Sequence, residues 1–354
     1  MTKRNYYKKN KNIMVVVPWI NTRNNHSGMF YFAKHLSNMI NAKLILQKNQ
    51  TNYWYKRIYT IITSVLIALK INIHAKKMGN VLLMEYLLPS VSQHIIAFIL
   101  KKIRKDLRLI GIVHLAPNHL KEKYNYNEDK IKKHLSYLDE VIVFGSTLKK
   151  YIEKFVNKKY IHHVLHYVDN SYYGKIPTKQ KNEKLNILFQ GNLKRSVGIL
   201  YELIESFNNS NEVHFHIMSG LNNYERFNKF RNVTIYPFVN EEELRGIMFN
   251  SQVSLNIMED TIGSNVITTS MSSGLAMIVT DVGSIRDYLD DNSSILCTSL
   301  KEYKKAIDTL INDQEMLYRL QLSSHKKSLD IEINNISNNF IKILNDKFNK
   351  QYNE

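Results

Sequence analysis

Residues 253–288, VSLNIMEDTIGSNVITTSMSSGLAMIVTDVGSIRDY, carry the most informative pattern in this chain. The apolar run Val253–Met258 predicts a buried strand, and a Gly-Ser-Asn turn follows at Gly263–Asn265. About two turns of small and hydroxylated residues come next, up to Gly274, and Leu275–Val279 forms a second apolar run. Glycine just past a short helix is a usual C-terminal stop, and Ser or Thr is a usual N-cap. The stretch therefore predicts a strand, a turn, a short helix and a second strand.

The start of this predicted helix is surrounded by small side chains. A helix N-terminus presents N–H groups without partners and a positive dipole, which suits a phosphate or diphosphate. Small neighbours allow the phosphate to approach the backbone closely. Many doubly wound folds contain the same unit with nothing bound, so the local pattern alone leaves both readings open.

Ser270–Gly283, SMSSGLAMIVTDVG, resembles part of a family signature, that of the retaining nucleotide-sugar glycosyltransferases of the GT-B fold, family four. That signature reads roughly Glu-Gly-Phe-Gly, four residues, then Glu-Ala-Met-Ala-x-Gly-x-Pro-Val-Ile-Ala-Thr-Asp-x-Gly-Gly. The two family glutamates fall on Thr261 and Thr269, and in the family the second holds the ribose hydroxyls. Glu259 and Asp260, just upstream, are the acidic residues available to replace the first.

A second resemblance lies in Ile187–Gly191 and the loop after it, which is similar to the family strand ending in Gly-Arg-Leu, three residues, Lys-Gly. The family Arg falls on Asn192 and the family Lys on Val197. Lys194 and Arg195 lie in the same loop, and either could supply the charge that pairs with a diphosphate.

The resemblance implies an α/β protein with two Rossmann-like domains facing across a cleft, and a C-terminal helix that crosses back to the first domain. It implies a retaining, hexosyl-type glycosyltransferase that moves a sugar from a nucleotide-diphosphate sugar to a glycan or lipid-linked acceptor in surface polysaccharide synthesis. The implied catalytic residue is His114, which follows a strand similar to one that ends in a family histidine. The expected donor-binding residues are Gly28, Gly191, Lys194, Arg195, Asp260, Gly263, Ser264, Asn265, Val266 and Thr269.

Gly28 and His114 are also candidate site residues on the basis of their positions in the predicted fold, independently of the family resemblance. Gly28 closes the loop after the first predicted strand, and His114 ends a strand at the carboxyl edge, where ligands bind in open α/β sheets. A plain turn glycine and a structural histidine are the alternatives.

We expect no metal and no cofactor other than the nucleotide-sugar co-substrate. His162 and His163 are adjacent on a predicted strand and so point to opposite faces, which disfavours joint ligation with His166. The sequence contains no Asp-x-Asp, the metal-binding pair of the other main glycosyltransferase architecture.

The chain divides into two similar halves. Apolar runs separated by helical stretches predict parallel sheets in both. We expect an N-terminal acceptor domain over 1–173, a lysine-rich linker over 174–184, a donor domain over 185–330 and a final helix over 331–354. The predicted strands are Ile13–Val17, Leu44–Leu46, Val81–Met84, Leu109–Val113, Val141–Phe144, His163–Leu165, Leu185–Gln190, Val213–Met218, Val233–Ile235, Val253–Met258, Met277–Thr280 and Ser294–Cys297.

Charge is distributed unevenly between the halves. Residues 1–180 hold 31 Lys+Arg and 9 Asp+Glu, a net charge of +22, whereas residues 181–354 hold 18 and 22, a net charge of −4. This asymmetry points to an anionic partner for the first half, either nucleic acid or an anionic membrane. Aromatic and basic residues at Tyr53–Arg57 precede the apolar stretch Ile58–Leu69, which suits either the interface of a bilayer or a helix buried in the domain. Lys101–Lys105 is a second basic cluster.

The remaining composition places the protein in a reducing compartment. One cysteine, Cys297, excludes an internal disulfide, and Ile58–Leu69 has 12 residues, well below the ~20 that span a bilayer. We therefore expect a cytoplasmic protein, peripheral at the inner face of the membrane. Two other functions remain open. One is a catalytically silent GT-B homologue that acts as a scaffold or partner. The other is a nucleic-acid-binding protein, although the sequence contains no recognised nucleic-acid-binding motif.

Overall fold

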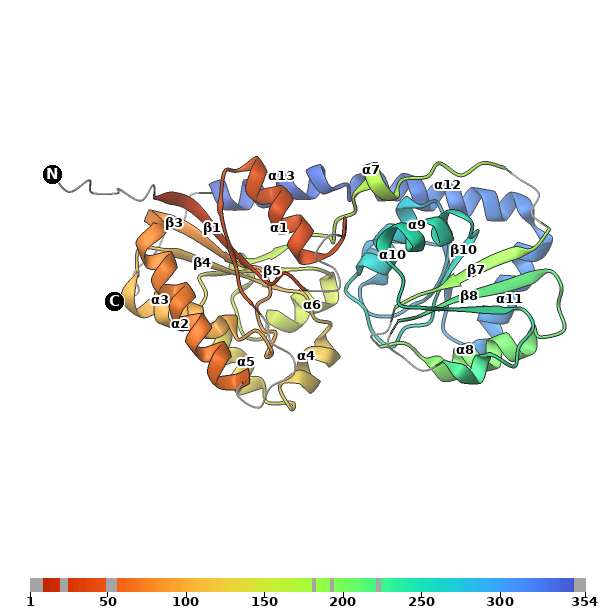
Figure 1. Cartoon of the computed structure of the whole chain (residues 1–354), viewed down its shortest axis with the longest axis horizontal. Helices are drawn as coiled ribbons and strands as arrows, with labels where there is room; N and C mark the ends of the chain where they lie inside the picture. The colour runs from red at the N-terminus through yellow and green to blue at the C-terminus, as the bar shows by residue number, and fades with distance from the viewer. Residues whose placement is uncertain are drawn as a thin grey trace. The chain divides into compact units, whose positions relative to one another are not determined.

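The computed structural model describes residues 9–19, 25–48, 56–179, 183–191, 194–220 and 224–346. The chain forms two compact units, one made of Met1–Val164 with Ile336–Glu354 and the other of Leu165–Asn335. Each contains one six-stranded sheet in which every strand pairing is parallel, with helices on both sides (Figure 1). The predicted α/β class with two Rossmann-like domains is confirmed.

The first unit alternates strands and helices, and its sheet has the order β2-β1-β3-β4-β5-β6. In Figure 1, α1 and α13 lie on one side of this sheet and α2 and α3 on the other. Its central strands are buried on both faces; Ile13, Met14, Val15 and Val16, for example, are completely buried. This explains why the strands read as continuous apolar runs rather than alternating ones. The elements are β1 (Asn10–Val16), α1 (Gly28–Met39), β2 (Lys43–Leu46), α2 (Lys56–His74), β3 (Ala75–Leu83), α3 (Gln93–Ile103), β4 (Arg108–Val113), α4 (Pro117–Lys123), α5 (Glu128–Leu135), β5 (Glu140–Val143), α6 (Ser146–Ile152), the 3-10 helix η2 (Lys158–Tyr160), β6 (Ile161–His163) and, from the end of the chain, α13 (Ile333–Asn345).

Helix α13 returns to the first unit, as predicted. Its Phe340 ring packs edge-on against Phe32 of α1, with 4.9 Å between ring centroids. Its last carbonyls are capped by the first unit: Arg108 Nη1 donates to Ile343 O at 2.9 Å, and Asn80 Nδ2 donates to Leu344 O at 3.1 Å. These bonds satisfy carbonyls that a helix end otherwise leaves without partners.

The second unit has the sheet order β12-β11-β10-β7-β8-β9. Figure 1 shows α9, α10 and α12 on one side of this sheet and α8 and α11 on the other. Phe189, Phe215, Phe227 and Leu255 are among the side chains that build the core between them. The elements are α7 (Asn170–Tyr173), β7 (Leu185–Phe189), α8 (Val197–Ser206), β8 (Val213–Gly220), η3 (Glu225–Phe227), β9 (Val233–Pro237), α9 (Glu241–Phe249), β10 (Val253–Asn256), α10 (Asn265–Ser272), β11 (Ala276–Thr280), η4 (Ile285–Asp287), β12 (Ser294–Cys297), α11 (Leu300–Asn312) and α12 (Gln314–Asp330).

The boundaries between the two units differ from the expected domain boundaries. Residues 165–173 belong to the second unit rather than to the N-terminal domain, and residues 331–335 also belong to the second unit. The cause is a set of hydrogen bonds at the end of α12. Val168 N donates to Ile331 O at 2.9 Å, and Ile333 N donates to Val168 O at 2.9 Å.

Most predicted strands differ from the observed ones by a few residues at one end or both, and β3 begins at Ala75 rather than at the predicted Val81. The predicted His163–Leu165 is Ile161–His163, and the predicted Val253–Met258 ends at Asn256. After Asn256 the backbone leaves the sheet, because Ile257 O accepts from Ser196 N at 3.1 Å in the loop that follows β7.

Some predicted features lie outside the described residues, namely Tyr53–Tyr55 and Asn192. The apolar stretch Ile58–Leu69 is helical as expected, within the longer α2. Among the described helices, none is both long and apolar enough to cross a membrane.

Candidate active site

Each sheet reverses its strand order at one point. In the second unit the reversal lies between β7 and β10, and in the first unit it lies between β1 and β3. In open α/β sheets, ligands bind outside the carboxyl ends of the strands at such a point. The loops after β7 and β10 are Gln190–Ser196 and Ile257–Ser264, which hold most of the predicted donor-binding residues. An isolated antiparallel bridge between Arg195 and Met258 joins the two loops.

The loop after β7 is shaped around the Arg195 guanidinium. Gly191 has a φ of +96°, and a Cβ there would lie 2.7 Å from Arg195 Nη2. Arg195 Nε donates to Gln190 O at 3.3 Å, and Arg195 forms no salt bridge with the described residues. Burial lowers the pKa of Arg195 to about 10, which still leaves it charged at neutral pH. A partly buried cation without an acidic partner is costly, so the loop is suited to an anion.

Lys194 is held differently. Its φ is +53°, and its Nζ lies 4.0 Å from Glu259 Oε2. Glu259 N also donates to Lys194 O at 3.0 Å, which ties the loop after β7 to the loop after β10. The charge of Lys194 is therefore partly offset, unlike that of Arg195.

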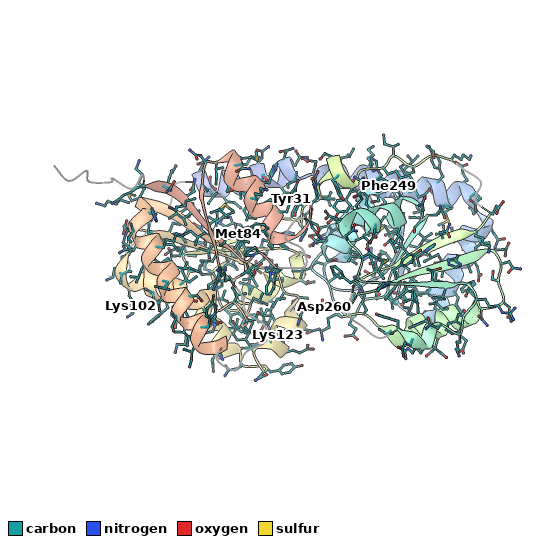
Figure 2. The ribbon with its side chains drawn as sticks, in the orientation of Figure 1. Tyr31, Met84, Lys102, Lys123, Phe249 and Asp260 are labelled. Atoms are coloured by element: carbon teal, nitrogen blue, oxygen red, sulfur yellow. The ribbon has the colours of Figure 1, made fainter. Side chains whose placement is uncertain are left out.

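The loop after β10 leads to the start of α10. Gly263 has a φ of +87°, and a Cβ there would lie 2.2 Å from Cζ of Tyr288. The Tyr288 hydroxyl accepts from His166 N at 2.8 Å and donates to Ile262 O at 3.2 Å. Burial raises the pKa of Tyr288, so the hydroxyl keeps its proton. Asp260, labelled in Figure 2, accepts from Thr261 N at 2.8 Å and so helps to fix the same loop.

Helix α10 begins with an open N-terminus. Ser264 occupies the N-cap position with φ −155° and ψ 164°, but its side chain makes no capping hydrogen bond. Its Oγ is buried and has no hydrogen-bond partner among the described residues. Asn265 and Val266, the first two helical residues, are partly exposed. The predicted strand, turn, helix and strand unit is thus present, and its helix start offers N–H donors and a hydroxyl.

Thr269, which stands where the family has its ribose-binding glutamate, lies one turn into α10. Its Oγ1 donates to Asn265 O at 2.6 Å, and the side chain is buried. The hydroxyl proton is therefore used within the helix.

A buried polar network that was not predicted lies at the same reversal point. Gln190 Nε2 donates to Ser270 Oγ at 3.2 Å, and Ser254 Oγ donates to the same atom at 2.9 Å. Asn256 Nδ2 donates to Ser254 Oγ at 2.9 Å, whereas Asn256 Oδ1 is buried without a partner among the described residues. Polar residues at the ends of two apolar strands were the available signal.

In the first unit, Gly28 and His114 were predicted from the sequence, and one further polar residue was not. Gly28 begins α1 with a φ of +83°, and His114 directly follows β4. Glu85 follows β3, at the reversal point of the sheet, and is 1% exposed. Its Oε1 accepts from Trp19 Nε1 at 2.9 Å, and its Oε2 has no partner among the described residues. Burial raises the pKa of Glu85 to about 8, against a smaller lowering by the Trp19 hydrogen bond.

Two of the histidines considered as metal ligands, His162 and His166, are hydrogen-bonded within the protein. His162 Nε2 lies 2.6 Å from Glu140 Oε2, and Arg108 Nη2 contacts the same oxygen at 2.6 Å. His166 Nδ1 lies 3.1 Å from Tyr167 O, and burial lowers its pKa to about 4. Within the described ranges, no group of three or more His, Cys, Asp or Glu residues could hold a metal ion.

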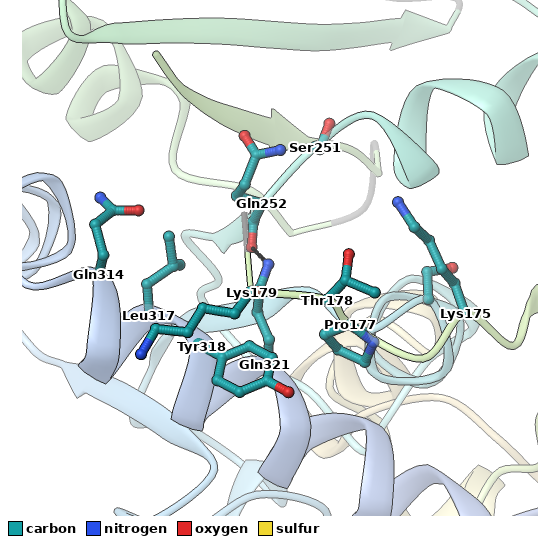
Figure 3. Close-up of a pocket in the computed structure, with 12 residues that line it drawn as sticks. Lys175, Pro177, Thr178, Lys179, Ser251, Gln252, Gln314, Leu317, Tyr318 and Gln321 are labelled. Carbon is teal, nitrogen blue, oxygen red and sulfur yellow. Dashed lines mark hydrogen bonds between the residues drawn. The ribbon is translucent and has the colours of Figure 1, made fainter. Parts of the chain in front are cut away.

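A small pocket lies at the other end of α10 (Figure 3). It is lined by linker residues Lys175 and Pro177, by Gly274, and by α12 residues such as Gln321, whose Nε2 donates to Gln252 O at 3.1 Å. Gly274 has a φ of +69°, and a Cβ there would lie 2.6 Å from Lys175 O, which confirms it as the stop of the helix. Because this pocket faces the C-terminal end of α10, we do not assign it to the donor.

The second unit, which holds these two loops, resembles a known protein family. Residues 184–313 match the family of group 1 glycosyl transferases. The group 1 region thus contains β7, α10 and both loops of the candidate site. Comparison with curated proteins gave no significant match.

Solved structures resemble the chain along nearly its whole length. A glycosyltransferase from Rickettsia africae has a TM-score of 0.65 at 13% identity, covering 96% of this chain and 98% of that one. Sucrose-phosphate synthase from Thermosynechococcus elongatus has a TM-score of 0.74 at 10% identity, covering 94% and 98%. Anabaena HepE, in complex with UDP and glucose, has a TM-score of 0.69 at 11% identity, covering 96% and 100%. At such identities the likeness shows the fold, which is that of the two-domain GT-B glycosyltransferases.

Proposed function

We propose that this chain is a glycosyltransferase that takes a sugar from a nucleotide-diphosphate sugar and transfers it to a glycan or lipid-linked acceptor. The observation that carries the proposal is the start of α10, where the uncapped helix end and the buried Ser264 hydroxyl lack partners among the described residues. This start lies at the strand-order reversal of the unit whose sequence matches group 1 glycosyl transferases.

The diphosphate is the leaving group of the proposed reaction. The bond between the anomeric carbon and the diphosphate oxygen breaks, a bond from that carbon to the acceptor oxygen forms, and the acceptor hydroxyl gives up its proton to the departing diphosphate. Negative charge grows on the diphosphate as it leaves. Arg195 and the N–H groups at Asn265 and Val266 would offset that charge, and such preorganised donors are a large contribution to catalysis. No metal is part of the proposal.

The finer assignments rest on the family resemblance. The likeness of Ser270–Gly283 to the retaining family supports retention of anomeric configuration and a hexosyl donor. We place His114 and the loop that ends at Gly28 beside the transferred sugar, and the remaining predicted residues at the nucleotide. Solved structures of HepE contain UDP or UDP-glucose, which makes uridine nucleotides the first to test.

The acceptor and location are supported by charge. A net charge of +22 over residues 1–180 suits work at an anionic membrane surface, where a lipid-linked acceptor is available. We therefore propose a peripheral enzyme at the cytoplasmic face of the membrane that contributes to surface polysaccharide synthesis.

Thermal unfolding with UDP-, GDP-, ADP- and CMP-sugars tests the proposal, because a ligand that binds only the folded state raises its stability. One nucleotide series should raise the midpoint, and incubation of that sugar with a membrane lipid extract should yield a glycosylated product. Donor binding without transfer or donor hydrolysis would favour the silent homologue, consistent with threonines at both family glutamate positions. Binding of nucleic acid but no nucleotide sugar would overturn the proposal.

A further inference from the structure

The outer face of α2 is unusual for a protein surface in water. Seven of its aliphatic side chains are between 36% and 58% exposed. We call them the α2 face: Ile58, Ile61, Ile62, Val65, Leu66, Leu69 and Ile73. Their spacing of three and four residues places them along one side of the helix. The side packed into the unit includes the small residues Ser64 and Ala68, so much of the large apolar surface points outward.

The α2 face extends across the neighbouring helix. Helix α3 packs beside α2, and Arg104 at its end donates to Asn72 O at 2.9 Å. Phe98 and Ile103 of α3 are 44% and 48% exposed. Neither α2 nor α3 contains an acidic residue. A helix surface meant for water normally carries charges of both signs, so this surface fits an apolar partner.

Lysines border the apolar surface at the C-terminal ends of these helices. Lys70, Lys77 and Lys102 are exposed there, and Figure 2 shows Lys102 projecting from α3. The nearby acid, Asp106, is neutralised by Arg104, whose Nε lies 2.8 Å from Asp106 Oδ1. The guanidinium holds the pKa of Asp106 at about 2, so the pair adds no net charge. This margin is therefore positive.

The other end of α2 borders a cavity of about 580 Å³. Ile61 of the α2 face lines it, together with the exposed Lys123 and Lys130. Lys123 is labelled in Figure 2 at the end of α4. Burial lowers the pKa of His94 and His134 to about 3 and 4, so the two stacked imidazoles in the wall of this cavity are neutral at physiological pH. Cations thus flank the aliphatic surface at both ends.

We propose that the α2 face docks this protein onto a bilayer that contains anionic phospholipid, with α2 lying in the plane of the membrane. A helix of 19 residues is ~28 Å long, and its aliphatic side would enter the region below the headgroups. The bordering lysines would reach the lipid phosphates, as long cationic side chains do at interfaces. The inference rests on the peripheral location proposed above, but not on the transferase activity.

Co-sedimentation of the full chain with vesicles tests this. The vesicles are phosphatidylcholine alone or mixed with phosphatidylglycerol. The aliphatic variant carries Ile62→Gln, Leu66→Gln and Leu69→Gln. Its matched control carries Ile176→Gln, Phe238→Gln and Leu329→Gln, which are exposed apolar residues of the second unit. The wild type and the control should bind the mixed vesicles equally well. The aliphatic variant should bind them at least about tenfold more weakly.

A second pair of variants tests the charge. Lys70→Gln, Lys77→Gln and Lys102→Gln should weaken binding to the mixed vesicles by about tenfold or more. The matched control, Lys150→Gln, Lys154→Gln and Lys158→Gln, removes the same charge from exposed lysines near α6 and should bind like the wild type. Donor-induced thermal stabilisation should be the same in every variant, which separates loss of docking from loss of the nucleotide site.

Equal binding by the aliphatic variant and the wild type would overturn the proposal, as would failure of the wild type to bind either vesicle. Dimers that form in sedimentation and are abolished by the aliphatic variant, without vesicle binding, would assign the α2 face to a second copy of the chain instead. A wild type that binds vesicles but no nucleotide sugar would leave the docking surface established and remove the proposed transferase.

Discussion

The phenol ring of Tyr288 fills the space beside Gly263 where any other residue would carry its Cβ. That Cβ would lie 2.2 Å from Cζ of Tyr288, and the φ of Gly263 is +87°. Tyr288 also joins two segments, since its hydroxyl contacts both His166 N and Ile262 O. The glycine is therefore required by the packing that aims the start of α10.

Gly263→Ala should lower both stability and nucleotide affinity. The left-handed backbone and the clash with Tyr288 together should cost about 2 kcal/mol or more in free energy of unfolding. Gly246→Ala is the matched control, because no atom lies within 4 Å of the added Cβ and the site is inside α9. It should stabilise the protein by up to about 1 kcal/mol. Thermal unfolding and calorimetry measure the two effects; a Gly263→Ala protein as stable as the wild type would refute the packing argument.

The Ser264→Ala variant tests whether Ser264 binds the nucleotide or caps helix α10. The Ser264 Oγ makes no hydrogen bond to the described residues, so its removal should leave the unfolding midpoint of the free protein unchanged or slightly higher. Nucleotide affinity should fall about tenfold if the hydroxyl contacts the diphosphate. Ser299→Ala is the contrasting variant. Ser299 Oγ caps α11 by accepting from Glu302 N, so its loss should cost about 1 kcal/mol of stability and leave nucleotide affinity intact. An unchanged affinity of Ser264→Ala would remove this serine from the site.

His114→Ala should lower the turnover number far more than the donor affinity. We place His114 of the first unit beside the transferred sugar, and we propose that the second unit makes the nucleotide contacts. Initial-rate kinetics give kcat and KM, and calorimetry gives the Kd for the donor. Equal turnover in the variant and the wild type would return His114 to a structural role.

Glu85 should make stability depend on pH. Its pKa is raised from 4.5 to about 8 by burial, so the folded state retains a proton that the unfolded chain has lost. Stability contributed in this way is present at low pH and is lost as pH rises from 4.5 towards about 8. The histidines whose pKa is lowered by burial add a slope of the opposite sign, because their unfolded imidazoles are still half protonated at pH 6.5. Between pH 6.5 and 8 the slope due to Glu85 is therefore the difference between the wild type and a variant that cannot titrate at position 85.

Glu85→Gln should flatten that slope, because the amide can keep the Trp19 hydrogen bond without titrating. Urea unfolding at several pH values in this window measures it. A wild type and a Glu85→Gln variant with parallel pH profiles would show that Glu85 is ionised in the folded protein.

Much of the fold could be predicted because local signals agree with the tertiary structure. The two apolar runs around Gly274 predict β10, α10 and β11, and Gly274 has the left-handed backbone that a helix stop requires. The end of β10 could not be placed, because it depends on Ile257 bonding to Ser196, far away in sequence. A pattern in one segment contains no information on such a partner.

The candidate site shows the same division. Arg195 was one of two candidate cations, and only the structure shows that the partly buried Arg195 packs beside Gly191 while Lys194 lies near Glu259. Glu85 was missed because a single acidic residue after an apolar strand is ordinary until its burial is known. The side of α2 that faces outward was equally hidden, since apolar residues fall on every side of Ile58–Ile73 in the sequence.

In the proposed site, the α10 start and Arg195 hold a nucleoside diphosphate without metal. Isothermal titration calorimetry in the presence of EDTA tests this most directly, with UDP as the first nucleotide and GDP as the second. The wild type should bind one of them with the same affinity in EDTA and in Mg²⁺. Arg195→Ala should bind the nucleotide about ten- to a hundredfold more weakly, because charge-assisted contacts contribute ~1.5–3 kcal/mol. Lys194→Ala should lose less affinity than Arg195→Ala. Arg231→Ala, an exposed arginine of the same unit, should bind like the wild type. Binding abolished by EDTA, or equal affinity in the wild type, Lys194→Ala and Arg195→Ala, would contradict the account.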